Sequence, residues 1–166
     1  MHALVRRITL SIAIAALPLV GTATLAAAAT TVNVSLSNMD MSKGLAVGQG
    51  YGVAGVDHSK TTMLVKATPD TVKAGAVTFM VKNDSKETVH YMLVIYLADP
   101  SKPLPYLADQ QKVDEDKAGV MGEVSELDPG KSGSLTVNLK PGKYLLTCNV
   151  PGHYDAGMWT TFEVTT

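Results

Sequence analysis

The sequence predicts an all-β sandwich of about seven to eight strands, preceded by a signal peptide. Short segments of alternating apolar and polar residues recur along the chain, and turns rich in Pro, Gly, Asn and Asp separate them. No segment has the sustained helical periodicity of a long amphipathic helix.

Each expected strand is identified by alternation or by a short apolar run. Val32, Val34 and Leu36 alternate with polar residues, which is typical of a half-buried strand. Residues 89–97 are apolar on both faces and predict a central strand buried on both sides. The expected strands are residues 31–37, 62–67, 76–82, 89–97, 122–125, 134–139, 144–150 and 159–164.

Two longer segments lack this regularity. Residues 38–60 are rich in Gly and predict a loop with at most a short helix. Residues 98–119 open with several prolines, which exclude a long helix, although residues 106–112 predict one or two helical turns.

Residues 1–29 have the composition of a secretory signal peptide. Arg6 and Arg7 precede an apolar, Ala-rich run that ends in small residues suited to cleavage. We therefore expect a periplasmic or otherwise exported protein, with one mature domain of residues 30–166 and no stable membrane insertion after cleavage. The two arginines leave both the general secretory route and the twin-arginine route open.

The charge balance of the chain is mild. The sequence holds 14 Lys+Arg against 15 Asp+Glu, and loss of Arg6 and Arg7 with the signal leaves a formal charge of about -3. Such a balance argues against nucleic-acid binding. About 137 residues then remain, which is enough for one domain with a hydrophobic core, and we expect a monomer.

The single cysteine, Cys148, requires an explanation in an exported protein. It has no partner for an internal disulfide, and an oxidising compartment tends to oxidise an idle thiol. With His153 and Met158 it forms a Cys-x4-His-x4-Met pattern. A thiolate, an imidazole and a thioether suit copper, provided that a second imidazole completes the set.

That imidazole has few sources in this chain. His2 leaves with the signal and His58 lies in the Gly-rich segment, whereas His90 opens the expected central strand. A ligand needs a rigid element, so His90 is the favoured candidate. Structural zinc usually requires paired cysteines, and thiol catalysis commonly uses a thiol at a helix N-terminus. A buried Cys beside a surface His is the remaining interpretation, and it leaves the spacing of Met158 as a coincidence.

The C-terminal part of the chain resembles the cupredoxins, the small blue-copper proteins. The resemblance covers roughly residues 59–166 and implies a Greek-key sandwich. The ligand loop is similar to that of rusticyanin-, auracyanin- and sulfocyanin-type members. The residues that carry the resemblance are Leu127-Asp128-Pro129-Gly130, Lys140-Pro141-Gly142-Lys143-Tyr144 and the loop from Cys148 through Pro151-Gly152-His153 to Gly157-Met158.

The same resemblance implies a role for each ligand and for the protein. It makes His90, Cys148 and His153 the equatorial ligands of one Cu(I)/Cu(II) ion and Met158 the weak axial ligand. It implies a one-electron carrier between redox partner proteins, and not an enzyme, with an edge of His153 as the electron's exit. A copper chaperone or copper-resistance protein that carries or sequesters the metal is the alternative function.

The aromatic residues around the ligands depart from the family in one place. Many cupredoxins have, directly after the first histidine, a side chain that ties the two ligand loops together, and this chain has Tyr91 there. The backbone amide of Tyr91 remains available to the thiolate. Tyr154 and Trp159 flank the ligand loop and are interpreted as packing residues.

Two further clusters have alternative interpretations. Met39, Met41, Met63 and His58 are candidates for a second, Met-rich Cu(I) site, against the simpler interpretation of Met as core filling. Residues 114–116 are acidic and form either a docking patch for a basic redox partner or a solvated loop surface.

Overall fold

The structure, a computed structural model, describes residues 28–38, 42 and 44–166. Almost all of the expected signal, residues 1–29, lies outside the described residues, as do Met39 and Met41 of the proposed second copper site. Within the described ranges, no helix is both long enough and apolar enough to cross a membrane.

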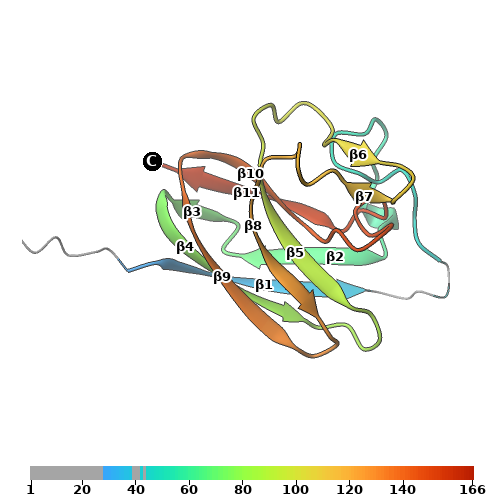
Figure 1. Ribbon diagram of the computed structural model, residues 1–166, viewed down its shortest axis with the longest axis horizontal. Coiled ribbons are helices and arrows are strands. Elements are labelled where there is room, and N and C mark those ends of the chain that lie inside the picture. Colours follow the sequence, from blue (N-terminus) through green and yellow to red (C-terminus); the bar gives the residue numbers. More distant parts are fainter. Residues whose placement is uncertain (1–27, 39–41, 43) are drawn as a thin grey trace, which may run out of the picture.

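The chain folds into a sandwich of two sheets, which confirms the predicted all-β class (Figure 1). The four-stranded sheet has the order β2-β1-β4-β9 and the five-stranded sheet the order β3-β11-β10-β5-β8. The first sheet consists of β1 (Thr30–Asn38), β2 (Met63–Thr68), β4 (Gly75–Asn83) and β9 (Ser132–Leu139). The second consists of β3 (Thr71–Lys73), β5 (His90–Tyr96), β8 (Val120–Leu127), β10 (Gly142–Thr147) and β11 (Trp159–Thr165).

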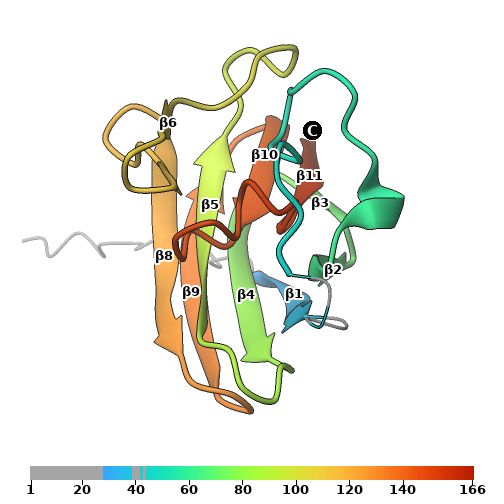
Figure 2. The same cartoon turned by 90° about the vertical axis from the view of Figure 1, so that its right-hand side faces the viewer.

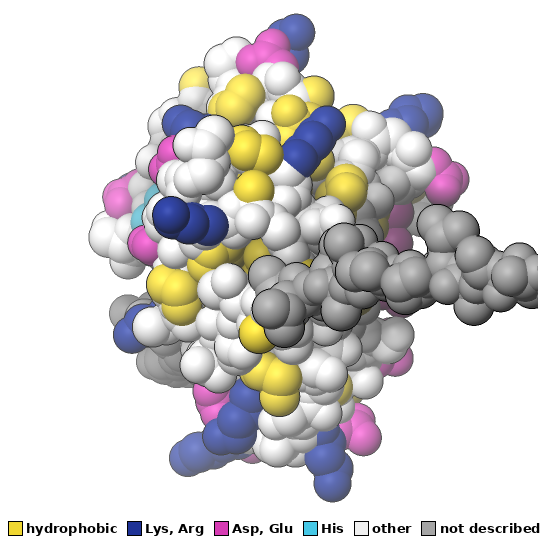
Figure 3. Space-filling view, turned by 90° about the vertical axis from the view of Figure 1, so that its left-hand side faces the viewer, with side chains coloured by type: hydrophobic (Ala, Val, Ile, Leu, Met, Phe, Trp, Pro, Cys, Tyr) yellow, Lys and Arg dark blue, Asp and Glu magenta, His cyan; other side chains and the backbone are white. Residues whose placement is uncertain are grey.

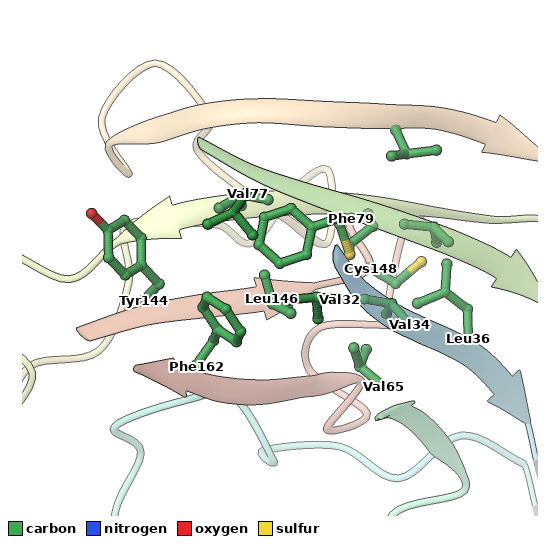
Figure 4. Close-up of a cluster of buried hydrophobic side chains, with 14 of the residues drawn as sticks. Val32, Val34, Leu36, Val65, Val77, Phe79, Tyr144, Leu146, Cys148 and Phe162 are labelled. Carbon is green, nitrogen blue, oxygen red and sulfur yellow. The ribbon is translucent and has the colours of Figure 1, made fainter. Parts of the chain in front are cut away.

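Apolar side chains from both sheets fill the space between them. Val32 and Leu36, the alternating residues of β1, are fully buried, as their spacing predicts. Phe79 of β4 and Phe162 of β11 meet edge to face with ring centroids 5.3 Å apart (Figure 4). Cys148 belongs to the same cluster, so its sulfur lies in a region from which the core excludes water.

Strand β5 is buried on both faces, as its apolar run predicts. Met92 and Val94 join the cluster between the sheets, whereas Leu93 and Ile95 belong to a second cluster. The irregular segment 98–119 supplies further members of that second cluster. This segment therefore covers the outer face of β5 and takes part in the packing of the domain.

The segment 98–119 contains a β-hairpin where helical turns were expected, so that prediction is wrong. Strands β6 (Tyr106–Leu107) and β7 (Lys112–Val113) pair antiparallel. The amide group of Asn149 holds the backbone of Val113, accepting from its N–H at 2.7 Å and donating to its C=O at 3.1 Å. A contact from 36 residues away thus mimics a neighbouring strand and overrides the local helical preference.

Smaller differences occur at the ends of elements. The expected strand 144–150 stops at Thr147, because the chain turns into the ligand loop there. Strand β3 lacks a recognisable pattern because it has only three residues. The prediction for residues 38–60 is consistent with the structure, since their only helical element among the described residues that is long enough to be assigned is the 3-10 turn His58–Lys60.

The irregular segments and the loop after β10 gather at one end of the sandwich, with β6 and β7 (Figures 1 and 2). Backbone hydrogen bonds support this arrangement: Gln49 N–H donates to Asp155 C=O at 2.8 Å and Gly152 N–H to Gln111 C=O at 2.8 Å. The opposite end shows charged side chains of both signs interspersed with apolar ones (Figure 3). The elements that lack regular structure are therefore concentrated around the candidate site.

Candidate metal centre

Three of the predicted ligands converge at this loop-rich end. Cys148 Sγ lies 3.4 Å from His153 Nδ1 and 3.7 Å from His90 Nδ1. The three atoms all lie within 4.8 Å of one another, and all three residues are buried. The two imidazole rings are 5.1 Å apart between centroids and inclined by 61°. Because the Nδ1 atom of each ring is the one close to the sulfur, both rings present their Nδ1 edge to Cys148.

The pairing of β10 with β5 explains how His90 meets a residue 58 positions later. The strands are antiparallel, and Thr147 at the end of β10 pairs with Leu93 near the start of β5. The chain leaving β10 therefore runs back alongside the start of β5. His90 is placed by a strand and Cys148 by the residue that precedes it, so both backbones are held by a sheet.

Met158 is brought to the same place by the neighbouring pair of strands. Thr147 pairs with Trp159 across β10 and β11, and the next residues in each direction are Cys148 and Met158. Cys148 N–H donates to Met158 C=O at 3.1 Å, and Met158 N–H donates to His153 C=O at 3.0 Å. Met158 is fully buried. The predicted fourth residue thus belongs to the same buried cluster.

Two glycines give the ligand loop its shape. Gly152 and Gly157 have φ values of +83° and +86°, in the left-handed region that other L-residues disfavour. Gly157 also lies against Thr61, where a Cβ atom would overlap the threonine methyl group. The glycines of the Cys-to-Met segment are therefore required by backbone conformation and, at Gly157, by close approach.

The Gly-rich segment 44–61, which we call the strap, crosses this loop. Gly48 N–H donates to Asp155 Oδ2 at 3.1 Å, and the indole N–H of Trp159 donates to Gln49 C=O at 2.7 Å. Together with the Gln49–Asp155 backbone bond, these contacts fasten the strap over the part of the loop that leads to Met158. Apart from His58 as a candidate for a second copper site, sequence reasoning assigned the strap no role, and the only signal for its packing on the loop was its high Gly content.

Burial disfavours the charged form of each of the three polar candidate ligands. Burial, with a contribution from the nearby His153, lowers the pKa of His90 from 6.5 to about 4. Burial likewise lowers the pKa of His153 from 6.5 to about 4. Burial raises the pKa of the Cys148 thiol from 9.0 to about 11. The protein's own contacts thus do not charge these groups.

Some contacts nevertheless favour a thiolate at Cys148. Backbone N–H groups of Val150 and Tyr91 donate hydrogen bonds to the sulfur, and the positive charge of Lys112 acts in the same direction on its pKa. The expected Tyr91 amide contact is therefore present. A bound cation would supply the remaining stabilisation, because metal ligation deprotonates a thiol outright.

The donor set fits copper. It comprises one sulfur ligand that becomes a thiolate, two imidazoles facing it through Nδ1, and a buried thioether, a combination that selects copper over the hard cations. His90 Nε2 is buried with no hydrogen-bond partner among the described residues. Its Nδ1 instead faces Cys148 Sγ at 3.7 Å, which leaves this nitrogen placed to share a metal with the sulfur.

The other predicted features have ordinary structural roles. His58 lies outside the cluster of ligands, with its ring edge-on to Trp159 at a centroid distance of 4.3 Å. Met63 is 1 % exposed and belongs to the core, as the simpler interpretation holds. Tyr154 is buried in the outer cluster and also packs as expected.

The acidic residues 114–116 do not form one solvated surface. Asp114 is buried and accepts from Lys117 Nζ at 2.7 Å. Glu115 accepts a hydrogen bond from Asn149 Nδ2 at 2.8 Å, so its carboxylate is turned toward the ligand loop. Of the three residues only Asp116 is exposed, which leaves little of the run available as a docking patch.

Comparison with solved structures agrees with this fold. The fold is similar to three solved structures: an auracyanin from Roseiflexus castenholzii (19% identity, TM-score 0.51, covering 84% of this chain and 99% of the other), auracyanin B (21%, 0.54, 83% and 90%) and auracyanin A from Chloroflexus aurantiacus (20%, 0.50, 81% and 99%), the last described as a "blue" copper protein. Curated protein sequences gave no match.

The family is settled by sequence. The family model of the sulfocyanin (SoxE) domain matches residues 72–166, which include every predicted ligand and more than half of the chain. Sulfocyanins are cupredoxins, which bind one copper ion and carry electrons rather than catalyse reactions. The chain therefore belongs to the sulfocyanin domain family.

Proposed function

We propose that this protein is an exported, monomeric one-electron carrier whose copper is held by His90 Nδ1, Cys148 Sγ and His153 Nδ1, with Met158 as a weak axial ligand. The observation that carries the proposal is the convergence of Cys148 Sγ with the two Nδ1 atoms at 3.4 and 3.7 Å in a buried pocket. Copper bound there supplies a one-electron couple between Cu(I) and Cu(II).

The protein's contribution is a fixed and dry set of ligands. The chain around His90 and Cys148 is held by paired strands, and the loop to Met158 is fastened by the strap. Ligands held in this way keep one geometry in both oxidation states, which reduces the reorganisation that accompanies electron transfer. Of the four residues, His153 alone retains exposed surface, 5 %, and its ring edge is the proposed exit for the electron.

Export and partners complete the proposal. Residues 1–29 act as a cleaved signal and residues 30–166 form the mature domain, with separate redox proteins as donor and acceptor. A compartment outside the cytoplasm is also the environment in which ligation protects the lone thiol of Cys148 from oxidation.

The proposal is tested by the visible spectrum of the copper-loaded mature protein. We expect an intense thiolate-to-copper charge-transfer band that Cys148→Ser abolishes and that His90→Gln and His153→Gln weaken or abolish. His58→Gln is the matched control, because this histidine lies outside the ligand cluster, and it should leave the band intact. A Cys148→Ser protein with unchanged colour would show that the ligands are wrongly assigned.

Metal exchange distinguishes an electron carrier from a copper chaperone. A carrier with this buried site should cycle reversibly between Cu(I) and Cu(II) and release little copper to a chelator. Rapid transfer of copper to the chelator, without reversible redox cycling, would instead assign the domain to copper delivery or sequestration.

A further inference from the structure

A partly buried hydrogen-bonded network begins one residue after His90 and one residue after Cys148. The Tyr91 hydroxyl lies 2.8 Å from Asn149 C=O and 3.1 Å from Glu115 Oε1, so its single proton is shared between two acceptors. Asn149 Nδ2 donates to the same Glu115 oxygen at 2.8 Å. Two donors, the Tyr91 hydroxyl and the Asn149 amide, therefore converge on the carboxylate of Glu115. We call these three residues the Tyr-Asn-Glu network.

The position of this network follows from the sequence. Tyr91 is the residue after His90, and Asn149 is the residue after Cys148. A hydrogen bond between Tyr91 and Asn149 thus joins the two ligand-bearing segments one residue away from each ligand. The Tyr91 backbone N–H also donates to the Cys148 sulfur, so this tyrosine holds the thiol segment through both its main chain and its side chain.

Burial makes Tyr91 and Asn149 costly to disrupt, whereas Glu115 is half-buried. Asn149 is fully buried and Tyr91 is 7 % exposed. Removing one partner of a buried hydrogen bond leaves the other unsatisfied, which generally costs more than the bond contributes. Burial, reinforced by Glu115, raises the pKa of Tyr91 far above its usual value and keeps its hydroxyl a neutral donor. The Tyr91 hydroxyl therefore keeps the proton that it donates to the network.

A third segment anchors the network. Both the amide oxygen and the amide nitrogen of Asn149 engage the backbone of Val113 in β7, two residues before Glu115. Lys112 Nζ lies 5.5 Å from the centroid of the Tyr91 ring, on the side where a surface hollow of about 250 Å³ opens. The segment 98–119 thus presents a carboxylate and a strand edge to the residues that follow the ligands.

We propose that the Tyr-Asn-Glu network positions the Cys148 sulfur relative to His90, and that the Glu115 carboxylate stabilises the more positive state of the copper centre. The proposal rests on the ligand assignment made above. In this chain Tyr91 ties the ligand segments together by bonding the backbone of the opposite segment. A negative charge beside the site favours Cu(II) over Cu(I), so Glu115 lowers the reduction potential.

Each variant of the network is paired with a control that removes the same chemical group elsewhere in the protein. Tyr91→Phe removes the hydroxyl, and Tyr144→Phe is its control because the Tyr144 hydroxyl also bonds a backbone carbonyl, that of Lys140 at 2.8 Å. Glu115→Gln removes a charge, and Glu126→Gln is its control because Glu126 lines the same hollow.

Three measurements read out the effect. Copper release to a chelator should be about two- to tenfold faster in Tyr91→Phe, as for the loss of one net hydrogen bond. Glu115→Gln should favour Cu(I) by up to about tenfold, which is a rise in potential of about 59 mV for one electron. In the metal-free protein, hydrogen exchange at the Tyr91 and Val150 amides should quicken in both variants and in neither control.

The outcomes separate this proposal from the proposed function. If Tyr91→Phe and Glu115→Gln match Tyr144→Phe and Glu126→Gln in all three measurements, the network does not position the site. If the native protein itself lacks the thiolate-to-copper band, the ligand assignment is wrong. Amide exchange of the metal-free protein then still measures whether the network holds the Cys148 segment.

Discussion

Acidification is expected to destabilise the metal-free protein through His90 and His153. Both imidazoles have a pKa near 6.5 in the unfolded chain and about 4 in the folded one. Between these values the unfolded chain binds protons that the folded chain does not, so stability is fully present above pH 6.5 and is lost as the pH falls toward 4. A pKa shift of this size lowers the free energy of unfolding by about 3 kcal/mol per histidine at pH 4.

Together the two histidines therefore lower the free energy of unfolding at pH 4 by about 6 kcal/mol. Typical proteins have a total free energy of unfolding of ~5–15 kcal/mol. Urea unfolding of the metal-free protein, followed from pH 7 to pH 4.5, measures the effect. In the steep part of the curve each histidine should contribute about 1.4 kcal/mol per pH unit to the slope.

Variants isolate that contribution from the carboxylates, which also titrate in acid. In the double variant His90→Gln with His153→Gln, the free energy of unfolding should depend less steeply on pH between pH 6 and pH 4.5. The control His58→Gln should retain the steeper dependence of the native protein. Parallel curves for the native protein and the double variant would refute the reasoning, because they would mean that the two imidazoles titrate alike in both states.

Three further changes probe the surroundings of the site. Phe79→Ala should lower the free energy of unfolding by ~3–5 kcal/mol in urea titrations, because it opens a cavity between the sheets. Gly157→Ala should lower it by ~2 kcal/mol or more, because φ is +86° and a Cβ atom would overlap Thr61. Trp159→Phe should cost ~1 kcal/mol and quicken amide exchange in the strap, because the 2.7 Å bond to Gln49 C=O is lost.

The candidate ligands were accessible to sequence reasoning because their pattern is local or depends on one element. Cys148, His153 and Met158 lie on one short loop, and the soft ligand set limits the metal. His90 followed from its place at the start of the most apolar strand. The structure brings His90, Cys148 and His153 together, and ligation of copper by them stays a prediction.

The surroundings of the site were not accessible in the same way. The hairpin β6–β7 depends on Asn149, and the strap depends on Asp155, 107 residues from Gly48. Such contacts leave no periodicity in either partner. The burial of the acidic run 114–116 was not predictable for the same reason, since charge alone predicts solvent exposure. The partners that turn Glu115 inward lie on β5 and the ligand loop.

The distribution of these contacts bears on the choice between carrying electrons and carrying metal. Copper delivery requires ligands that open to a partner, so that the metal passes from one protein to another. Here the segments that would have to move are tied in several directions: the loop to Met158 by the strap, and the Cys148 segment by Tyr91 and by Val113. Release of copper by opening of these segments would break these bonds together, and each buried bond that is broken costs free energy. Electron transfer requires none of this movement, because only a ring edge of His153 has to reach the surface. The arrangement therefore favours a site that retains its metal and exchanges electrons.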